Sequence, residues 1–148
     1  DTYSMAFEAI VPPLIKAFKP DVLFTQLGID THYQDPITHM RLTTQGFTKT
    51  VSRLAELSTQ SESWIATGGG GYDISAVARG WSMALAVMVG AKIPNKIPKE
   101  FQALIGNTTF KDEPPDPLES VLTQQMRGFA EHSVEDVYRV IFPYFGLR

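Results

Sequence analysis

Apolar residues recur along the first part of the chain with spacings that predict a helix followed by a short strand. From residue 4 to residue 18 they repeat every three or four positions, as in an amphipathic helix. Pro12 and Pro13 lie inside this helix and should kink it. Residues 22–27 are then almost continuously apolar, as in a strand that is buried on both faces of a sheet, and Gly28 ends the strand.

The same alternation continues after a polar loop at residues 29–42. Thr43 or Thr44 can cap a second amphipathic helix. A second strand is expected at about residues 63–67, and a third amphipathic helix should end near Gly90. This order of helices and strands predicts an α/β fold, with a parallel sheet and right-handed crossover connections.

Two polar side chains follow the two predicted strands. Asp30 comes shortly after the first strand, and Tyr72 comes shortly after the second. Parallel strands place their carboxyl ends at one edge of the sheet, which is where open α/β sheets bind ligands. We therefore expect Asp30 and Tyr72 to open on the same side, although they are far apart in the sequence.

The last third of the chain lacks this regular pattern. It is interrupted by prolines, which are Pro94, Pro98, Pro114, Pro115 and Pro117. Ser133 can cap a last helix through a Ser-x-x-Asp sequence that ends at Asp136. We therefore divide the chain into an α/β part at residues 1–91 and a mainly helical C-terminal extension of the same domain at residues 92–148.

Composition narrows the class of protein. The 148 residues fit one domain, and a net charge of −3 gives no general attraction to nucleic acid or to an anionic membrane. The absence of cysteine excludes disulfides and thiolate chemistry and favours a reducing, cytoplasmic setting. There is neither a membrane-spanning apolar run nor a signal-like segment. The chain begins at Asp1 rather than Met, so we expect a fragment.

Four consecutive glycines, Gly68 to Gly71, follow the second predicted strand. Glycine-rich turns between a strand and a helix often bind the phosphates of a nucleotide. Here, however, Asp73 stands where the dinucleotide pattern needs a third glycine, and no Gly-Lys-Ser/Thr follows. No acidic residue occurs from Ile74 to Lys99 to hold a ribose. The sequence therefore argues against a nucleotide site.

Asp30 and Tyr72 carry complementary chemistry. A neutral tyrosine hydroxyl can donate a hydrogen bond to an oxygen that gains negative charge in a transition state. A carboxylate is a hard ligand suited to Zn²⁺ or another divalent cation. Taken singly, Asp30 would more often cap a loop or helix, and Tyr72 would more often pack with its hydroxyl hydrogen-bonded. Without further information, these structural roles are the more frequent ones for each residue.

Two segments together resemble one protein family. Gln-Leu-Gly-Ile-Asp-Thr-His at residues 26–32 with Asp35-Pro36, and Gly-Gly-Gly-Gly-Tyr-Asp at residues 68–73, are similar to the second half of zinc-dependent histone-deacetylase-like domains. Within that superfamily they are most similar to the bacterial acetoin-utilisation branch, the AcuC-type deacetylases. Further matches are Asp1-Thr2-Tyr3, Ala6-Phe7, Pro12 to Asp21, Leu42 to Gly46, and Trp81. The resemblance covers about residues 1–91.

This resemblance implies a fold. The family has a three-layer arginase/deacetylase-like architecture, in which an open parallel sheet carries helices on both faces. The chain would form only the C-terminal portion of that fold.

The resemblance also implies roles for particular residues. Asp30 corresponds to the last of three protein ligands of a catalytic Zn²⁺, and Tyr72 to the tyrosine that hydrogen-bonds the acyl oxygen opposite the metal. Gly70 and Gly71 match glycines that line a narrow channel for the acetyl-lysine stem, and Ile37 falls at the channel rim. Zn²⁺ would polarise the amide carbonyl and activate water, while Tyr72 stabilises the tetrahedral oxyanion.

Gln26, His32 and Asp35 belong to the same motif. We expect them to contact and position the site residues rather than to bind metal or substrate themselves. The Asp-x-His spacing of residues 30–32 makes His32 a candidate second metal ligand. The family pattern, however, aligns this histidine with the loop of the third ligand, so we favour a supporting or solvent-facing role. The other two ligands, and a His-His pair for proton transfer, are expected upstream of Asp1.

These observations predict the C-terminal part of a zinc-dependent lysine deacetylase, which hydrolyses acetyl-lysine to lysine and acetate. It should act on acetylated proteins, bind neither nucleic acid nor membrane directly, and pack against the missing N-terminal part of its own domain. As 148 residues alone it should be inactive. Two alternatives stay open: a non-catalytic module that binds an acylated protein or a partner chain, and an acetylpolyamine deacetylase.

Overall fold

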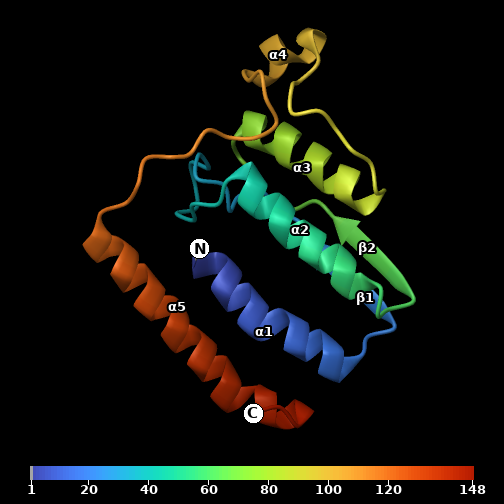
Figure 1. Ribbon diagram of the computed structural model, residues 1–148, viewed down its shortest axis with the longest axis vertical. Helices are drawn as coiled ribbons and strands as arrows, with labels where there is room; N and C mark the ends of the chain where they lie inside the picture. Colours follow the sequence, from blue (N-terminus) through green and yellow to red (C-terminus); the bar gives the residue numbers. More distant parts are fainter. Residues whose placement is uncertain (1) are drawn as a thin grey trace.

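In the computed structural model, which describes residues 2–148, helices alternate with strands as far as residue 88 (Figure 1). The elements in chain order are α1 (Thr2–Phe18), β1 (Val22–Gln26), α2 (Thr44–Ser58), β2 (Ser63–Thr67), α3 (Ile74–Met88), α4 (Lys99–Ile105), α5 (Ser120–Val140) and the 3-10 helix η1 (Phe142–Phe145). The predicted order of helices and strands is confirmed. Asp1, which belongs to one of the predicted motifs, lies outside the described residues.

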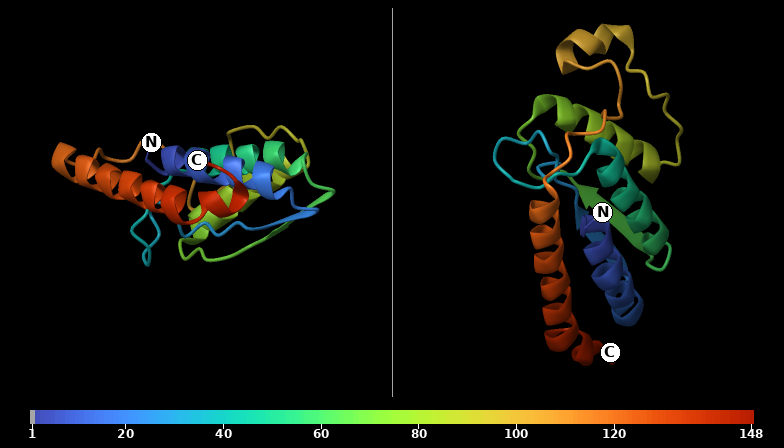
Figure 2. Two further views of the ribbon diagram at one scale, coloured as in Figure 1. Left: turned by 90° about the horizontal axis from the view of Figure 1, so that it is seen from below. Right: turned by 60° about the vertical axis from the view of Figure 1, so that its left-hand side comes forward.

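The two strands form a parallel sheet, as predicted. Val22 lies opposite Ser63, and the register continues to Gln26 opposite Thr67. Helix α2 connects the strands, and Figure 2 shows α1 and α2 on one side of the sheet. Thr43 is the N-cap of α2, because its side-chain oxygen accepts a hydrogen bond from the backbone N–H of Gly46 at 3.1 Å.

The prediction that the first strand is buried on both faces is wrong. Exposed and half-buried residues alternate along β1 and along β2. Phe24 is 63% exposed, and its neighbours on the same face, Val22 and Ile65, are also exposed. The physical reason is that the helices of residues 2–148 leave this face of the sheet open. The parallel α/β class is confirmed, but residues 2–148 cover only one face of the sheet.

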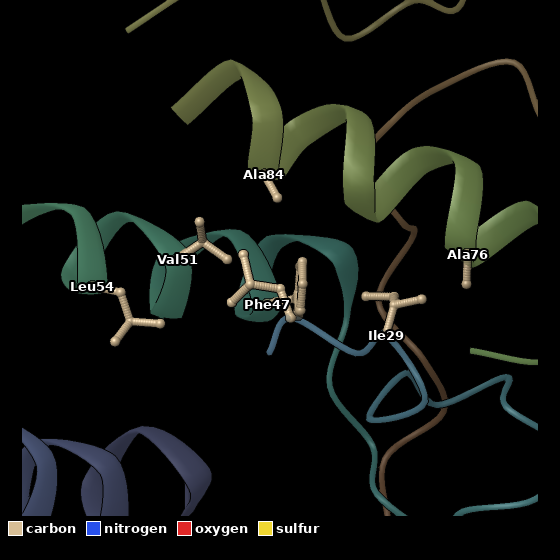
Figure 3. Packing of buried hydrophobic residues seen from close by; sticks show 7 residues of the cluster. Ile29, Phe47, Val51, Leu54, Ala76 and Ala84 are labelled. Carbon is tan, nitrogen blue, oxygen red and sulfur yellow. The ribbon is translucent and has the colours of Figure 1, made fainter. Parts of the chain in front are cut away.

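The hydrophobic core lies on the covered face. It consists of residues from the segment that follows β1, from α2 and from α3, namely Leu27, Ile29, Phe47, Val51, Leu54, Ala76 and Ala84. Figure 3 shows Phe47 on α2 and Ile29 on the loop beside the end of that helix, with Ala76 and Ala84 pointing from α3 toward this side. Alanines on α3 let the two helices approach closely. Each fully buried large apolar side chain contributes about 1.5–3 kcal/mol to folding.

Helix α1 continues through Pro12 and Pro13, and the kink expected there stays a prediction. The helix is joined to α2 by an ion pair between Glu8 and Arg53, with the Arg53 Nε atom 3.1 Å from Oε1. On its other side it packs along α5, the long helix that runs beside it in Figures 1 and 2. The Tyr138 hydroxyl donates a hydrogen bond to the Ala9 carbonyl at 3.3 Å, and so ties the C-terminal part to the α/β part.

The predicted start of the last helix at Ser133 is wrong. Helix α5 begins at Ser120, and Ser133 lies in its interior. There the Ser133 hydroxyl donates to the carbonyl of Phe129, four residues earlier, at 2.9 Å. A serine hydroxyl inside a helix can donate a hydrogen bond to the carbonyl four residues earlier. A Ser-x-x-Asp sequence is therefore compatible with a helix interior as well as with a helix start. Within the described residues, no helix is long and apolar enough to cross a membrane.

Candidate functional site at the carboxyl edge of the sheet

The loops that follow β1 and β2 are hydrogen-bonded to each other. The Gly70 carbonyl accepts hydrogen bonds from the backbone N–H of Ile29 at 2.7 Å and from that of Asp30 at 3.2 Å. Asp30 and the glycine run that leads to Tyr72 therefore lie at the same edge of the sheet. This part of the sequence prediction is confirmed, and it defines the candidate site.

Each of the four glycines packs against a side chain that would have to shift to accommodate a Cβ atom. A Cβ at Gly68 would lie 2.7 Å from the Trp81 ring, one at Gly69 would lie 2.5 Å from the Gln26 side chain, and one at Gly71 would lie 2.6 Å from Ile29. A Cβ at Gly70 would overlap the carboxylate of Asp30. Close packing of the turn thus accounts for glycine at positions 68, 70 and 71, a reason that the sequence did not reveal, whereas the flexible end of the exposed Gln26 side chain can move aside from a Cβ atom at Gly69. Lining of a substrate channel by Gly70 and Gly71 stays a prediction.

Asp30 has a fixed backbone and an uncommitted carboxylate. Its N–H donates to Gly70, and its carbonyl accepts a hydrogen bond from the Thr38 hydroxyl. Within residues 2–148, nothing donates a hydrogen bond to its half-buried carboxylate. Asp30 lines a cavity of about 180 Å³ together with Gln26 and Thr31, among other residues. The buried Thr31 hydroxyl has no hydrogen-bond partner in the described chain.

These observations define how a metal ion would fit. A free, half-buried carboxylate on a fixed backbone is a suitable oxygen ligand for Zn²⁺. However, no three His, Asp or Glu side chains gather into a metal site anywhere in residues 2–148. The donor set of residues 2–148 therefore fits a single protein ligand of a metal site, namely Asp30.

The backbone of Tyr72, just before α3, is held by hydrogen bonds. Its N–H donates to the Oδ2 atom of Asp35 at 2.9 Å. The next residue, Asp73, caps the helix by accepting a hydrogen bond from the Ala76 N–H at 2.7 Å. The Tyr72 side chain is 55% exposed, and its hydroxyl has no hydrogen-bond partner among residues 2–148. The phenol is thus free to donate to a ligand.

Asp35 joins the two loops. Its Oδ1 atom accepts hydrogen bonds from the N–H groups of Ile37 at 2.9 Å and Thr38 at 3.0 Å, while Oδ2 holds Tyr72. Burial raises the pKa of the Asp35 carboxyl, but the three backbone N–H groups outweigh burial and hold the pKa below its ordinary value. An ionised Asp35 is therefore part of the folded loop. The exposed Ile37 side chain lies beside it, and its place at a channel rim stays a prediction.

His32 is 0% exposed, so the solvent-facing role considered for it is wrong. Its Nδ1 atom accepts a hydrogen bond from the Gln34 N–H at 3.2 Å, which requires that nitrogen to carry no hydrogen. Its Nε2 atom lies 2.9 Å from Oδ2 of Asp112 and donates to it. Both ring nitrogens are committed, and neither is open to a metal ion. His32 acts within the protein, behind the candidate site.

Asp112 and Arg79 are buried charged residues that sequence reasoning missed. Asp112 accepts hydrogen bonds from His32, from the Thr44 N–H at 2.6 Å and from Arg79 Nη1 at 2.5 Å. The side chains of Arg79 and Asp112 are 1% and 2% exposed. Burial raises the pKa of Asp112, but the bonds from His32, Thr44 and Arg79 outweigh it and hold the pKa well below its usual range.

The sequence contained one signal for this pair. Arg79 lies three residues after the buried Ala76 and four before the buried Met83, so it stands on the inward face of α3. A charge on such a face requires a buried partner. Nothing in the sequence indicates that the partner is Asp112, since the Lys-Asp-Glu-Pro segment has the composition of a solvated loop.

Comparison with known proteins supports the family resemblance. Residues 1–88 match the family described as "Histone deacetylase domain". The chain is 35% identical over 105 residues to the acetoin utilization protein AcuC of Bacillus subtilis (strain 168), covering 68% of this chain and 27% of that protein. It is 37% identical over 92 residues to AcuC of Staphylococcus xylosus, covering 60% of this chain and 24% of that protein.

A solved structure has the same fold. The crystal structure of an HDAC homolog complexed with SAHA superposes with a TM-score of 0.68 and 20% sequence identity, over 88% of this chain and 38% of that one. At this identity the likeness concerns the fold. The chain spans about a quarter of the length of the AcuC proteins that it matches. The match over residues 1–88, more than half of the sequence, shows that the chain belongs to the histone deacetylase family and resembles its AcuC-type members.

Proposed function

We propose that this chain is the C-terminal part of the catalytic domain of a zinc-dependent protein lysine deacetylase. The observation that carries the proposal is the pairing of two uncommitted groups at one edge of the sheet. The Asp30 carboxylate and the Tyr72 hydroxyl have no hydrogen-bond partners within residues 2–148, while Gly70 and Asp35 hold their backbones in place. Such preorganised groups are typical of a site that awaits a metal ion and a substrate.

Each residue has a distinct role in the proposed reaction. Asp30 would hold Zn²⁺, which when bound supplies a Lewis acid that polarises the acetyl carbonyl and activates water. Tyr72 donates its hydroxyl hydrogen to the acyl oxygen as that oxygen becomes an oxyanion. Asp35 keeps the Tyr72 backbone in position, because it accepts the Tyr72 N–H. Gly70 and Gly71 would border the channel for the lysine stem, with Ile37 at its entrance.

In this proposal the catalytic site of the 148-residue chain is incomplete. One carboxylate does not hold catalytic zinc tightly, and His32, with both nitrogens committed, does not serve as a general base. The remaining ligands and the proton-transfer pair would come from the other part of the family domain. That part would cover the open face of the sheet, where Val22, Phe24 and Ile65 are exposed. Acetylated proteins would be the substrates of the complete domain.

The test uses the longer protein that the proposal requires, with acetyl-lysine peptide turnover and zinc content as readouts. Replacing Tyr72 with phenylalanine should lower kcat by about 10²–10³-fold and leave zinc content unchanged, because only an oxyanion donor is lost. The matched control is Tyr144→Phe, since Tyr144 is an exposed tyrosine in η1. Unchanged turnover in the Tyr72→Phe variant would contradict the mechanism. Acetylspermidine assayed in parallel distinguishes a polyamine deacetylase.

A second candidate, a non-catalytic module that binds an acylated protein, is favoured by one observation. No three-ligand metal site occurs within residues 2–148. The two candidates differ in the residues encoded upstream. If the upstream codons encode an Asp-x-His segment and a His-His pair, the enzyme proposal is supported. If the reading frame starts close to Asp1 and encodes neither motif, the binding module is supported. The enzyme proposal also expects no stoichiometric zinc in the 148-residue chain by itself.

A further inference from the structure

A segment beyond the family-matched residues runs along the back of the candidate site. Residues 107–112, which we name the strap, follow α4 and pass the N-terminal ends of α3 and α2 (Figure 1). The Asn107 side-chain amide donates to the Ser75 hydroxyl at 2.7 Å, and the Thr44 hydroxyl donates to the Phe110 carbonyl at 3.0 Å. The strap therefore ties the starts of both helices together.

Helix α2 holds the end of the strap from two directions. The Gln45 side chain accepts a hydrogen bond from the Asp112 N–H and donates one to the Asp112 carbonyl, both at 2.9 Å. The Thr44 N–H donates to the Asp112 carboxylate at 2.6 Å, at the positive end of the helix dipole. With its backbone and side chain both fixed, Asp112 is a rigid acceptor.

The bond from His32 carries this rigidity into the loop of the candidate site. Asp112 holds the His32 ring at 2.9 Å. The same ring accepts the Gln34 N–H, and the His32 carbonyl accepts the Asp35 N–H at 3.0 Å. Asp35 in turn holds the Tyr72 N–H. An unbroken series of hydrogen bonds thus leads from the strap to the tyrosine.

We propose that Asp112 is a positioning residue of the site. By fixing the His32 ring it sets the loop on which Asp35 holds the backbone of Tyr72, so the strap outside the family-matched residues belongs to the support of the site. The catalytic consequence rests on the proposed function. The mechanical link between Asp112 and Tyr72 does not, and the two are tested separately.

The mechanical link is tested by amide hydrogen exchange on the 148-residue chain, read by NMR. His32→Phe keeps a buried ring and the Arg79–Asp112 ion pair but breaks the link to the loop. It should accelerate exchange of the Tyr72 amide at least tenfold and leave the core amide of Val51 unchanged. A general loss of stability would accelerate both amides. Unchanged protection of Tyr72 in the folded variant would overturn the proposal.

Two further measurements keep the test decisive if a variant does not fold. Asp112→Asn also removes the partner of Arg79 and so destabilises the whole chain, but it should accelerate exchange of the Tyr72 amide at least tenfold more than exchange of the Val51 amide. Asp116→Asn should change neither amide, because within residues 2–148 Asp116 is engaged through its backbone carbonyl, by Arg41. In the unmodified chain, the amides of Thr44 and Tyr72 should open with equilibrium constants that agree within threefold. Opening of Tyr72 a hundred times more readily than Thr44 would overturn the proposal without any substitution.

The catalytic consequence is measured in the longer protein. His32→Phe should lower kcat at least tenfold with KM within twofold and zinc content unchanged, since it disturbs the orientation of Tyr72 rather than substrate or metal binding. If His32→Phe accelerates exchange of the Tyr72 amide selectively but the unmodified longer protein does not hydrolyse acetyl-lysine peptide, the proposed function is refuted. The mechanical link between Asp112 and Tyr72 is then still supported. An active enzyme whose kcat is unaffected by His32→Phe would overturn the positioning role.

Discussion

The buried ion pair between Arg79 and Asp112 makes a quantitative prediction about folding. Arg79 Nη1 lies 2.5 Å from Asp112 Oδ1, and both side chains are almost completely shielded from water. Arg79→Met leaves a buried carboxylate with hydrogen bonds from His32 and Thr44 but without its cation. Asp112→Asn leaves a buried guanidinium with only neutral acceptors, among them the Phe110 carbonyl at 3.4 Å.

The expected magnitude follows from this burial. Removing one partner of a buried pair costs about 3–5 kcal/mol, because the other charge stays uncompensated in a medium of low polarity. The free energy of unfolding of a whole domain is only about 5–15 kcal/mol. Each single variant should therefore lose a large share of its stability. The double variant contains neither charge, so its loss should be smaller than the sum of the single losses by at least about 1 kcal/mol.

The assay is urea unfolding of the parent chain, the two single variants and the double variant, followed by circular dichroism. Arg139→Met is the matched control. Arg139 pairs with Asp136 on the exposed surface of α5, so its loss should change the free energy of unfolding by no more than about 0.5 kcal/mol. The reasoning is refuted if Arg79→Met costs less than about 1 kcal/mol, or if the two single losses add up in the double variant.

Two further predictions concern pH and the glycine run. The pKa of Asp112 is lower in the folded chain than in the unfolded chain, so the unfolded chain binds the proton first as pH falls. Stability should therefore decrease from about pH 5 toward pH 2, less steeply in the Arg79→Met/Asp112→Asn variant, and equal slopes in urea unfolding would contradict this. Gly70→Ala should cost about 1–3 kcal/mol, because the new Cβ overlaps the Asp30 carboxylate. Gly128→Ala, with open space around it in α5, should instead stabilise the chain by about 0.5–1 kcal/mol. Equal melting temperatures of the Gly70→Ala variant and the parent chain would show that the close approach is not required.

Much of the fold could be predicted because local chemistry acts over a few residues. The three- and four-residue spacing of apolar side chains marks the first three helices, and Thr43 marks the start of α2 by capping it. The burial of β1 could not be predicted in this way, because a run of apolar residues does not state how many faces of the strand are covered. The start predicted for the last helix is also wrong. A serine side chain such as that of Ser133 forms hydrogen bonds with the backbone both at a helix start and in a helix interior, so its presence does not distinguish the two.

The motif residues of the candidate site were likewise readable, whereas the reasons for several of them were not. The sequence alone indicates a carboxylate and a tyrosine that follow two parallel strands, and topology brings such residues to one edge of the sheet. That the glycines make room for Trp81, Gln26 and Asp30 became visible only when the side chains were in place. Close packing between loops depends on distances that a linear pattern does not contain.

By itself, the sequence determined the order of elements, the family and the two groups that carry the proposed chemistry, Asp30 and Tyr72, because each depends on local spacing or on a contiguous motif. The tertiary structure decided how that chemistry is supported. Asp112 reaches His32 across 80 positions of the chain and Arg79 across 33. A buried charge requires a partner, but only the folded chain selects which residue comes within hydrogen-bonding distance of it.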